Sequence, residues 1–317
     1  MGYFYEISGV ELDSEIALLS LPHRITLNGP GPGLRVRVRI GSPKPFAGPV
    51  EWIVMRTYHD VAVPYLSVAR LDAGYLVRIH DQVDFHVNAA GTEIVCSPIE
   101  GLPARTLEQL LLDQILPQVL QLLGRPSLHA SAVALRSSHV IAFLGRSGMG
   151  KSTLAASFAV GSAPDGAIVS DDCLALSLTA RGVEVHPSCP STRLRHDAAR
   201  ALLPDRELSP TCPRTAKLRV DFGSARGELV LARAYVLEAA DSAPIITRLS
   251  RRDGIAALAT HLHRMDPDDR RRLTDELGYL ETIVNHVTVA RLGFRRRFDE
   301  LPAVRAAIRA DIGSAAA

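Results

Sequence analysis

The sequence lacks an excess of charge of either sign. Its 36 lysines and arginines nearly balance its 34 aspartates and glutamates, which leaves a formal net charge of +2 over 317 residues. Proteins that bind nucleic acid or an anionic membrane through charge usually carry a strongly basic domain or patch. We therefore expect neither nucleic acid nor a membrane as a partner.

Cysteine is also scarce. The four cysteines, Cys96, Cys173, Cys189 and Cys212, form no C-x-x-C pair and fit no zinc spacing. Reduced thiols in a cytosolic protein are the simplest interpretation of this pattern.

A long apolar run and a leader segment are missing too. The most apolar stretch, Leu107–Leu123, is interrupted by polar residues and by Pro117, so it falls short of a membrane span. The first twenty residues contain acidic side chains where a signal peptide has a basic start and an apolar run. We expect a cytoplasmic protein.

The N-terminal part of the chain is predicted to be rich in β-strands. Hydrophobic residues make up 47% of the sequence and charged residues 22%, which is enough for a sizeable core and for two domains. Short runs of β-branched, aromatic and alternating polar residues are separated by turn residues. Residues 1–103 are therefore predicted to form a small β-rich domain, assigned by elimination to recognition of a substrate or partner. The predicted strands are Tyr3–Ile7, Leu34–Ile40, Glu51–Tyr58, Tyr65–Arg70, Tyr75–Ile79 and Asp84–Val87.

Residues 104–317 are predicted to form an α/β catalytic domain. A helix is expected from Thr106, with a kink or a break at Pro117. The tail of the chain is expected to be helical, because its apolar residues recur at helical spacing. The predicted strands are Leu128–Leu135, His139–Leu144, Ala167–Ser170, Cys173–Leu178, Leu218–Val220, Gly227–Leu237 and Ile245–Leu249.

The strongest motif is G-x-x-x-x-G-K-[ST], which matches Gly145, Gly150, Lys151 and Ser152. An apolar run, Val140–Leu144, precedes it, and a helix-forming run follows. Glycines let backbone N–H groups turn inward toward a phosphate, and a helix start adds unpaired donors and partial positive charge. The motif predicts an ATP-binding loop in which Lys151 meets the outer phosphates and Ser152 ligates Mg²⁺. The residues expected to line the nucleotide are Gly145, Arg146, Ser147, Gly148, Met149, Gly150, Lys151, Ser152 and Thr153.

Two adjacent acids, Asp171 and Asp172, end the apolar strand that is predicted after this loop. One carboxylate in such a place can hold Mg²⁺, and a second can act as a general base toward an attacking hydroxyl. Aspartate is also common in polar turns and helix caps. Spacing alone leaves both interpretations open.

One histidine, His129, lies on the strand predicted before the loop strand. A lone histidine in a strand is usually a hydrogen-bonded structural residue. Its local sequence therefore favours a structural role.

Taken together, these segments resemble the kinase domain of HPr kinase/phosphorylase. That family has a histidine-containing strand, the loop G-x-S-G-x-G-K-S and an apolar strand ending in Asp-Asp, in the order and at a spacing similar to Leu128–Val133, the loop and Ile168–Asp172. The segments Tyr5–Ile16 and Ser147–Ala156 are more similar to stand-alone HPr-kinase-like proteins of peptide biosynthesis clusters, including lasso-peptide precursor kinases. The similarity covers the opening and about residues 128–176, and the rest of the chain matches less well.

The resemblance implies a P-loop kinase domain of the HPr kinase C-terminal type that uses ATP and Mg²⁺. Carried over residue by residue, it implies that Asp171 is the catalytic base and that Asp172 serves the metal together with Ser152. It also implies a phosphate-binding Lys151 and a supporting His129.

The chain departs from the family in three places, one of which is its β-rich N-terminal region. Ala130 stands where the HPr enzymes usually have glycine, and their later arginine-containing signature, which goes with phosphorolysis, is not found. The sequence therefore gives no support to the reverse reaction on a phosphoserine.

We therefore expect an ATP- and Mg²⁺-dependent serine kinase acting on a peptide or small protein, such as a lasso-peptide precursor or an HPr-like protein. A small-molecule kinase of the adenylylsulfate-kinase type shares the loop, but usually has Asp-Gly-Asp-Asn where this chain has Ser170–Cys173. A P-loop ATPase or binding module without a phosphorylated product is a further alternative, although no LSGGQ-like segment of a transporter ATPase is evident. The sequence leaves open the acceptor, the choice between ATP and GTP, and assembly into a homo-oligomer.

Several basic residues are weaker candidates. Arg193, Arg195 and Lys217 follow the two acids and could meet a γ-phosphate or an acidic peptide, although solvated surface charge is the simpler interpretation of each. Arg295–Arg297 is expected to be solvated or ion-paired. His261 lies near a predicted helix end, where capping or exposure explains it.

Overall fold

The chain forms two structural units, and each unit is built from two separate segments of the sequence. The computed structural model describes residues 2–22, 33–42, 50–57, 63–135, 139–160, 166–189, 191–206, 208, 217–223, 225 and 227–313. Unit 1 consists of residues 1–127 and 263–274, and unit 2 of residues 128–262 and 275–317. This division does not coincide with the predicted domains 1–103 and 104–317, because the helical segment after Pro103 belongs to unit 1.

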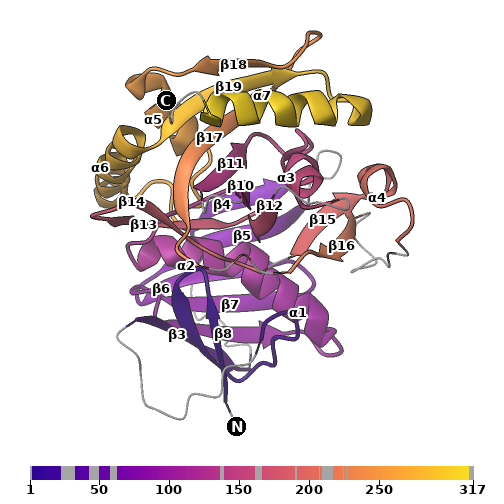
Figure 1. Ribbon diagram of the computed structural model, residues 1–317. Helices are drawn as coiled ribbons and strands as arrows, with labels where there is room; N and C mark the ends of the chain where they lie inside the picture. The colour runs from indigo at the N-terminus through magenta and orange to yellow at the C-terminus, as the bar shows by residue number, and fades with distance from the viewer. Residues whose placement is uncertain are drawn as a thin grey trace. The chain divides into compact units, whose positions relative to one another are not determined.

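Unit 1 is built on one mixed β-sheet (Figure 1). Among the described residues, its strands lie in the order β1-β2-β3-β8-β7-β6-β5-β4. β3 pairs in parallel with β2 and β8, and the other neighbours are antiparallel. The strands are β1 (Tyr3–Ile7), β2 (Val10–Ser14), β3 (Leu34–Ile40), β4 (Trp52–Thr57), β5 (Pro64–Leu71), β6 (Gly74–Ile79), β7 (Val83–Asn88) and β8 (Glu93–Pro98).

All six strands predicted for this region are present, with described ends within one residue of the prediction; Tyr58, the predicted end of one strand, lies outside the described residues. β2 and β8 were not predicted. In β2, Val10 and Leu12 are buried, but acidic residues alternate with them and lower the strand signal. Cross-strand ion pairs compensate for those acids, such as Glu11 with Arg35 at 3.0 Å.

A bent helical segment completes the N-terminal part of unit 1. α1 (Ala104–Leu110) and α2 (Leu116–Leu122) are joined by a π-helical turn, Leu111–Ile115. Pro117 follows this turn, and because proline has no N–H to donate, the wider turn occurs where a regular helical bond would be lost. The predicted break at Pro117 is thus a π-turn within one helical run.

Residues 263–274 return to unit 1 and are held there by buried polar contacts. The Arg70 Nε donates to Asp266 Oδ2 at 2.9 Å, and the Asp266 side chain is almost fully buried. The backbone N–H of Met265 donates to Gln121 Oε1 at 2.9 Å. These contacts explain why a segment far along the sequence belongs with the first sheet.

Unit 2 contains a second mixed sheet of the described strands, which carries the predicted loop. The strand order is β12-β10-β11-β17-β14-β13-β9, and β19 pairs with both β17 and β18. β11, β17 and β19 are parallel to one another. A separate two-stranded ribbon is formed by β15 and β16. The strands are β9 (Ser127–Leu128), β10 (Ala130–Leu135), β11 (His139–Leu144), β12 (Gly166–Ser170), β13 (Leu174–Thr179), β14 (Gly182–His186), β15 (Ser191–Arg195), β16 (Lys217–Asp221), β17 (Val230–Ala239), β18 (Ile245–Arg248) and β19 (Thr288–Phe294).

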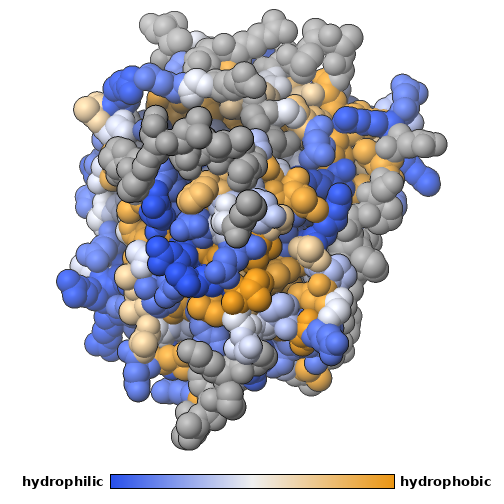
Figure 2. All heavy atoms as spheres, turned by 90° about the horizontal axis from the view of Figure 1, so that it is seen from below, coloured by the Kyte–Doolittle hydropathy of each residue, from blue (hydrophilic) through white to orange (hydrophobic). Residues whose placement is uncertain are grey.

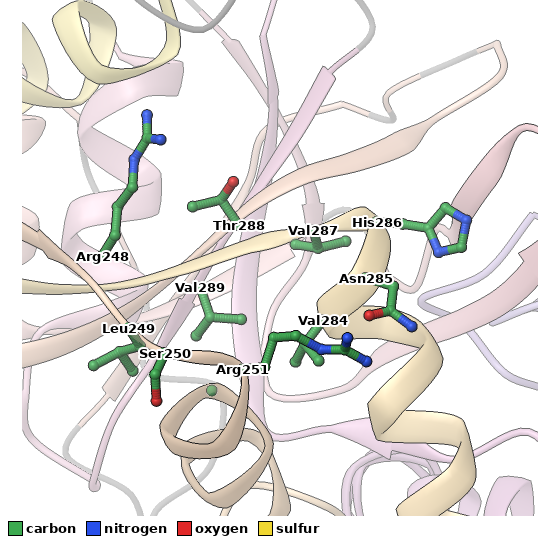
Figure 3. A pocket seen from close by; sticks show the side chains of 11 residues that line it. Arg248, Leu249, Ser250, Arg251, Val284, Asn285, His286, Val287, Thr288 and Val289 are labelled. Atoms are coloured by element: carbon green, nitrogen blue, oxygen red, sulfur yellow. The ribbon is translucent and has the colours of Figure 1, made fainter.

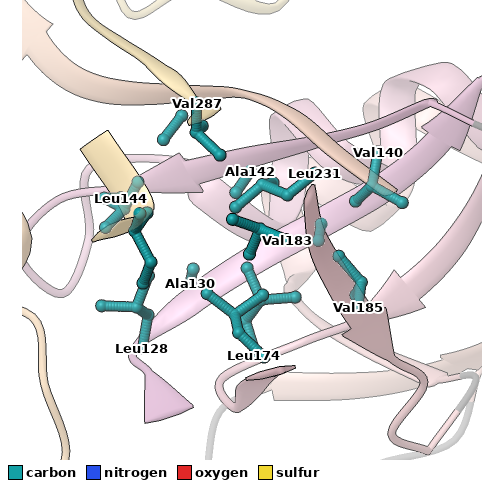
Figure 4. Packing of buried hydrophobic residues seen from close by; sticks show 14 of the residues in the cluster. Leu128, Ala130, Val140, Ala142, Leu144, Leu174, Val183, Val185, Leu231 and Val287 are labelled. Carbon is teal, nitrogen blue, oxygen red and sulfur yellow. The ribbon is translucent and has the colours of Figure 1, made fainter. Parts of the chain in front are cut away.

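Helices cover both faces of this sheet (Figure 1). α3 (Lys151–Ala159) and α7 (Leu301–Gly313) pack on one face with Ile141 and Phe143 of β11. α5 (Arg251–Ala259) and α6 (Arg270–His286) contribute to the cluster on the other face. Val140, Ala142 and Leu144 belong to that second cluster, part of which is drawn in Figure 4. Successive side chains of a strand point to opposite faces, so β11 is buried on both sides, as its continuous apolar run predicts. The remaining helix, α4 (His196–Leu202), lies next to the β15–β16 ribbon.

The prediction of an entirely helical tail was wrong. Residues 288–294 form β19, which pairs along its whole length with residues 233–239 of the central strand β17. Their apolar residues occur at both alternating and helical spacings, and the pairing with β17 decides between them. β15 and β14 were also not predicted, and the predicted strand Leu128–Leu135 is interrupted at His129.

The cysteines and helices add two observations. Cys96, Cys173 and Cys189 form no disulfide with one another, and Cys212 lies outside the described residues. Of the helices that the structure describes, none combines the length and the apolar character needed to cross a membrane.

Apolar side chains also reach the surface of unit 1. Leu19, Met55, Val63 and Ile99 are all more than half exposed. The face shown in Figure 2 carries orange apolar side chains among blue hydrophilic ones. Folded proteins commonly expose apolar atoms in this way, so these side chains do not define a partner surface.

Replacing Phe143 by alanine should destabilise unit 2 strongly. Its ring is fully buried and stacks with those of Phe158 and Tyr235, at 6.2 Å between centroids in each pair. We expect a loss of about 3–5 kcal/mol in the free energy of unfolding, measured by chemical denaturation. Leu178→Ala, at an exposed position of β13, is the control and should cost less than about 0.5 kcal/mol. Equal losses in the two variants would contradict the packing described above.

Candidate active site

The glycine-rich segment Gly145–Ser152 connects β11 to α3, so a strand, a loop and a helix start follow one another as the motif requires. Gly145, Gly148 and Gly150 have φ values of +148°, +82° and +93°, a region that strains any residue with a Cβ atom. A Cβ on Gly145 would also lie 3.3 Å from the Met149 Cβ. The loop conformation therefore depends on these glycines.

The other residues predicted to line a nucleotide lie in the same turn. Arg146, Ser147 and Met149 form it together with the glycines, and Thr153 lies in the first turn of α3. Met149 is partly buried and packs against the core. The structure thus keeps the whole predicted segment together.

Lys151 begins α3 and is buried over the loop. Its Nζ donates to the carbonyl oxygens of Gly145 at 2.7 Å and Arg146 at 3.4 Å. Burial lowers the pKa of the ammonium group, while the charges of Asp172 and Asp171 act in the opposite direction. The side chain is therefore close to both the loop and the acids.

Asp171 follows β12, is partly buried and accepts hydrogen bonds from three donors. Its Oδ1 accepts from Ser131 Oγ at 2.5 Å and from Ser152 Oγ at 2.9 Å, and its Oδ2 accepts from the Arg193 backbone N–H at 3.0 Å. Burial and the neighbouring charge of Asp172 raise its pKa, and the hydrogen bonds oppose that rise. One carboxylate thus joins β10, α3, β12 and β15.

Asp172 has a different environment. It is a non-glycine residue in the left-handed region, with a φ of +66°, which is uncommon and directs its side chain away from the strand path. Its Oδ2 accepts a hydrogen bond from the Arg193 guanidinium. Burial acts to raise the pKa of Asp172, but the charges of Arg193, His129 and Lys217 and the Arg193 hydrogen bond together outweigh it and lower the pKa to about 2.

The β15–β16 ribbon brings Arg193 to the acids. Leu194, Leu218 and Val220 are buried on its inner side in a cluster that includes Ala156 of α3. Arg193 occupies the alternate face, because side chains alternate along a strand. From the sequence, Arg193 was interpreted as a solvated surface charge. The alternation of Thr192 and Leu194 with arginines was the available signal, but no partner strand could be recognised for it.

His129 lies between β9 and β10, and its backbone N–H donates to the His261 carbonyl at 2.7 Å. Burial lowers the pKa of His129 to about 4, with a further contribution from the charge of Lys151. Burial lowers the pKa of His261 as well, and Lys151 again contributes. The structure therefore brings the predicted His129, and the unpredicted His261, within electrostatic reach of the loop lysine.

The oxygen atoms around Asp171 fit a small hard cation. Two neighbouring ligands of an octahedral Mg²⁺, each at about 2.1 Å, lie about 3.0 Å apart, and Ser152 Oγ and Asp171 Oδ1 are 2.9 Å apart. Within the described ranges, no cluster of three or more His, Cys, Asp or Glu side chains could hold a metal ion. Mg²⁺ commonly takes only one or two carboxylates and completes its shell with water and phosphate oxygens, so the donor set is compatible with it.

A pocket elsewhere in unit 2 contains none of these residues (Figure 3). It lies where β18 leads into α5 and α6 leads into β19. Arg248, Arg251 and His286 are among its lining side chains. Because it adjoins the amino end of β19, it does not belong to the edge of the sheet that carries the loop.

The buried state of His129 predicts a pH-dependent stability. The unfolded chain takes up a proton near the ordinary pKa of 6.5, whereas the folded chain resists protonation down to about 4. Stability is therefore present above pH 6.5 and is lost as the pH falls from 6.5 to 4, by on the order of 3 kcal/mol. Urea denaturation at a series of pH values across this range measures the free energy of unfolding. This free energy should fall less steeply with falling pH in His129→Gln than in the unmodified protein, and His261 should account for the pH dependence that is left. Equal slopes in the two proteins would show that His129 is not buried in its neutral form.

Arg193→Gln should destabilise the protein, since it leaves Asp172 beside Asp171 without its cation. We expect a loss of about 1–3 kcal/mol in the free energy of unfolding. Arg195→Gln is the matched control, because Arg195 lies on the same strand but pairs with Asp197 at the exposed surface and should change stability by less than about 1 kcal/mol. Thermal unfolding at neutral pH measures the stability of both variants. Equal losses in the two would show that the Arg193–Asp172 pair stabilises the protein no more than the exposed Arg195–Asp197 pair does.

Comparison with known proteins gives little further information. No protein-family model and no curated protein matches this chain. Among solved structures, the Hpr(Ser) kinase/phosphatase from Coxiella burnetii is similar at a TM-score of 0.32 and 11% sequence identity, over 59% of this chain and 97% of that chain. A similarity of this strength does not assign the chain to a family.

Proposed function

We propose that this protein is an ATP- and Mg²⁺-dependent kinase that phosphorylates a serine hydroxyl of a peptide or small protein. The observation that carries the proposal is the position of the Asp171 carboxylate, 2.9 Å from the hydroxyl of Ser152. Ser152 follows the loop lysine directly, at the start of the helix that leaves the glycine-rich loop. Phosphate-binding amides, a lysine and oxygen ligands for a metal thus lie in one place.

The geometry supports an exchange of the roles that the family resemblance implies for the two acids. Ser152 and Asp171 together would hold Mg²⁺, because their oxygens are spaced for neighbouring ligand positions, whereas the resemblance implies Asp172 as the partner of Ser152. When bound, the metal neutralises charge on the outer phosphates. Lys151 and the loop amides would hold the phosphates themselves, and His129 would support the site from β10's amino end.

Asp172 would then act as the base. Its carboxylate would take the proton of the serine hydroxyl as the serine oxygen bonds to the γ-phosphorus. The bond from that phosphorus to the bridging oxygen breaks, and ADP leaves. Both acids are partly exposed, but the oxygens of Asp171 already accept bonds from two hydroxyls and a backbone N–H. The Asp172 side chain, which is 22% exposed, is therefore the acid that we assign to the acceptor. Arg193, which pairs with Asp172, would have to yield to the acceptor.

The acceptor class rests on the sequence motifs that resemble HPr-kinase-like proteins of peptide biosynthesis clusters. A lasso-peptide precursor or an HPr-like protein is the acceptor that this resemblance favours. Recognition of that acceptor by the β-rich unit 1 belongs to the same proposal.

Incubation with γ-³²P-labelled ATP, Mg²⁺ and a panel of serine-containing peptides tests the proposed function directly. Label on a serine of a peptide supports it. Label on a small molecule would instead support the adenylylsulfate-kinase type of activity, and release of free phosphate alone would support an ATPase.

Two asparagine variants separate the roles of the acids. Asp172→Asn should lower the transfer rate by about 10²–10⁴-fold and leave Mg²⁺-dependent ATP binding intact, because it removes only the base. Asp171→Asn should raise the Mg²⁺ concentration needed for ATP binding by roughly 10- to 100-fold, since it removes a charged ligand. Calorimetric titration with ATP at several Mg²⁺ concentrations measures the second effect, and initial rates measure the first.

The opposite pattern would restore the assignment made from the sequence. In that case Asp171→Asn would abolish transfer without changing the Mg²⁺ dependence. Lys151→Ala, which removes the phosphate-binding ammonium, is the positive control for loss of nucleotide affinity.

A further inference from the structure

The order of the parallel strands in unit 2 indicates how a bound nucleotide would be oriented along the edge of the sheet. β11, β17 and β19 are parallel neighbours in that order, so the segments that follow them emerge at one edge of the sheet. Ligands of open α/β sheets bind at this carboxyl edge. The glycine-rich loop follows β11, and residues 295–297 follow β19.

The position of the two acids determines on which side of β11 the terminal phosphate of the nucleotide would lie. Asp171 follows β12, which pairs with β10 on the side of β11 opposite to β17. If the proposed function holds, on which this inference rests, the metal and the terminal phosphate lie on the β10–β12 side. The nucleoside end must then extend toward β17 and β19.

One arginine from the β19 side already contacts the loop. The Arg296 guanidinium donates to the carbonyl oxygen of Gly148, in the middle of the loop. Its two neighbours have other partners: Arg295 Nη1 lies 3.2 Å from Glu300 Oε1, and Arg297 Nη2 lies 2.7 Å from Asp299 Oδ2. Arg296 is thus the member of the arginine triplet that is directed at the loop.

The turn that carries Arg296 is anchored to the sheet. Arg295 Nε donates to the Asp241 carbonyl at 3.2 Å, and the Ala240 N–H donates to the Phe294 carbonyl at 3.1 Å. These bonds join the segments that follow β17 and β19. Arg296 therefore projects from a defined position, although its own side chain is exposed.

We propose that Arg296 binds the nucleoside end of the nucleotide, with the plane of its guanidinium stacked against the base. The contact with Gly148 holds one edge of the guanidinium at the loop and leaves its faces available. A planar cation on the face of an aromatic ring is attracted by the ring quadrupole. Stacking is tolerant of the identity of the base, so this contact accepts adenine and guanine alike.

Binding of ATP, GTP and inorganic tripolyphosphate to the full-length protein tests this assignment. Arg296→Ala should weaken ATP and GTP binding by about 3- to 30-fold, which corresponds to a cation–π contact of ordinary strength. Tripolyphosphate has no base, so its affinity should not change. Arg296→Trp should restore most of the affinity for ATP, because an indole also stacks, whereas Arg296→Lys should not.

Arg297→Ala is the matched control, since it removes the same charge one residue away. It should leave all three affinities unchanged. Equal losses for tripolyphosphate and ATP in Arg296→Ala would show that Arg296 acts on phosphate, and unchanged ATP affinity would show that it does not bind nucleotide; either result overturns the inference. If the unmodified protein binds ATP but transfers no phosphate, the proposed function fails while the stacking contact is still measured. If it binds no nucleotide, both are overturned.

Discussion

The organisation of unit 2 depends on one carboxylate and the donors around it. Asp171 receives hydrogen bonds from two hydroxyls and one backbone N–H, which come from β10, α3 and β15. An ionised carboxyl group without such partners would be very costly to bury. The three bonds form together only when α3, β10 and the β15–β16 ribbon are all in place. The same requirement fixes Ser152, at the start of the helix, relative to the strand that carries the acids.

The charges near Asp171 and Asp172 balance in a way that suits phosphate chemistry. Two adjacent acids repel each other at close range, and the cations Arg193 and Lys151 offset this repulsion. Each of these cations is held by protein oxygen atoms, the first by Asp172 and the second by loop carbonyls. A nucleotide and its metal would bring both signs of charge, so the cations could exchange their protein partners for phosphate oxygens without leaving the acids uncompensated.

The sequence predicted those features that depend on local pattern. The apolar run before the loop, the glycines and Asp171 could be recognised because each element is contiguous in sequence. β19 and β15 could not be recognised, because their short sequences do not by themselves favour a strand. Their pairing with β17 and β16 decides their conformation. Arg193 and Arg296 were interpreted as surface charge for the same reason: each approaches the loop or the acids through a strand partner that single-sequence patterns do not identify. The proposed roles of the two acids rest on their contacts and on the left-handed backbone of Asp172, which spacing does not encode.

The central claim is that the glycine-rich loop and the two acids form one metal–nucleotide site. Crystals grown with Mn²⁺ and a non-hydrolysable ATP analogue test it most directly, through the anomalous signal of the metal. The account predicts a manganese peak in coordination distance of Ser152 Oγ and Asp171, with the terminal phosphate toward Asp172. A manganese peak away from these oxygens, or an analogue bound outside the loop, would contradict it.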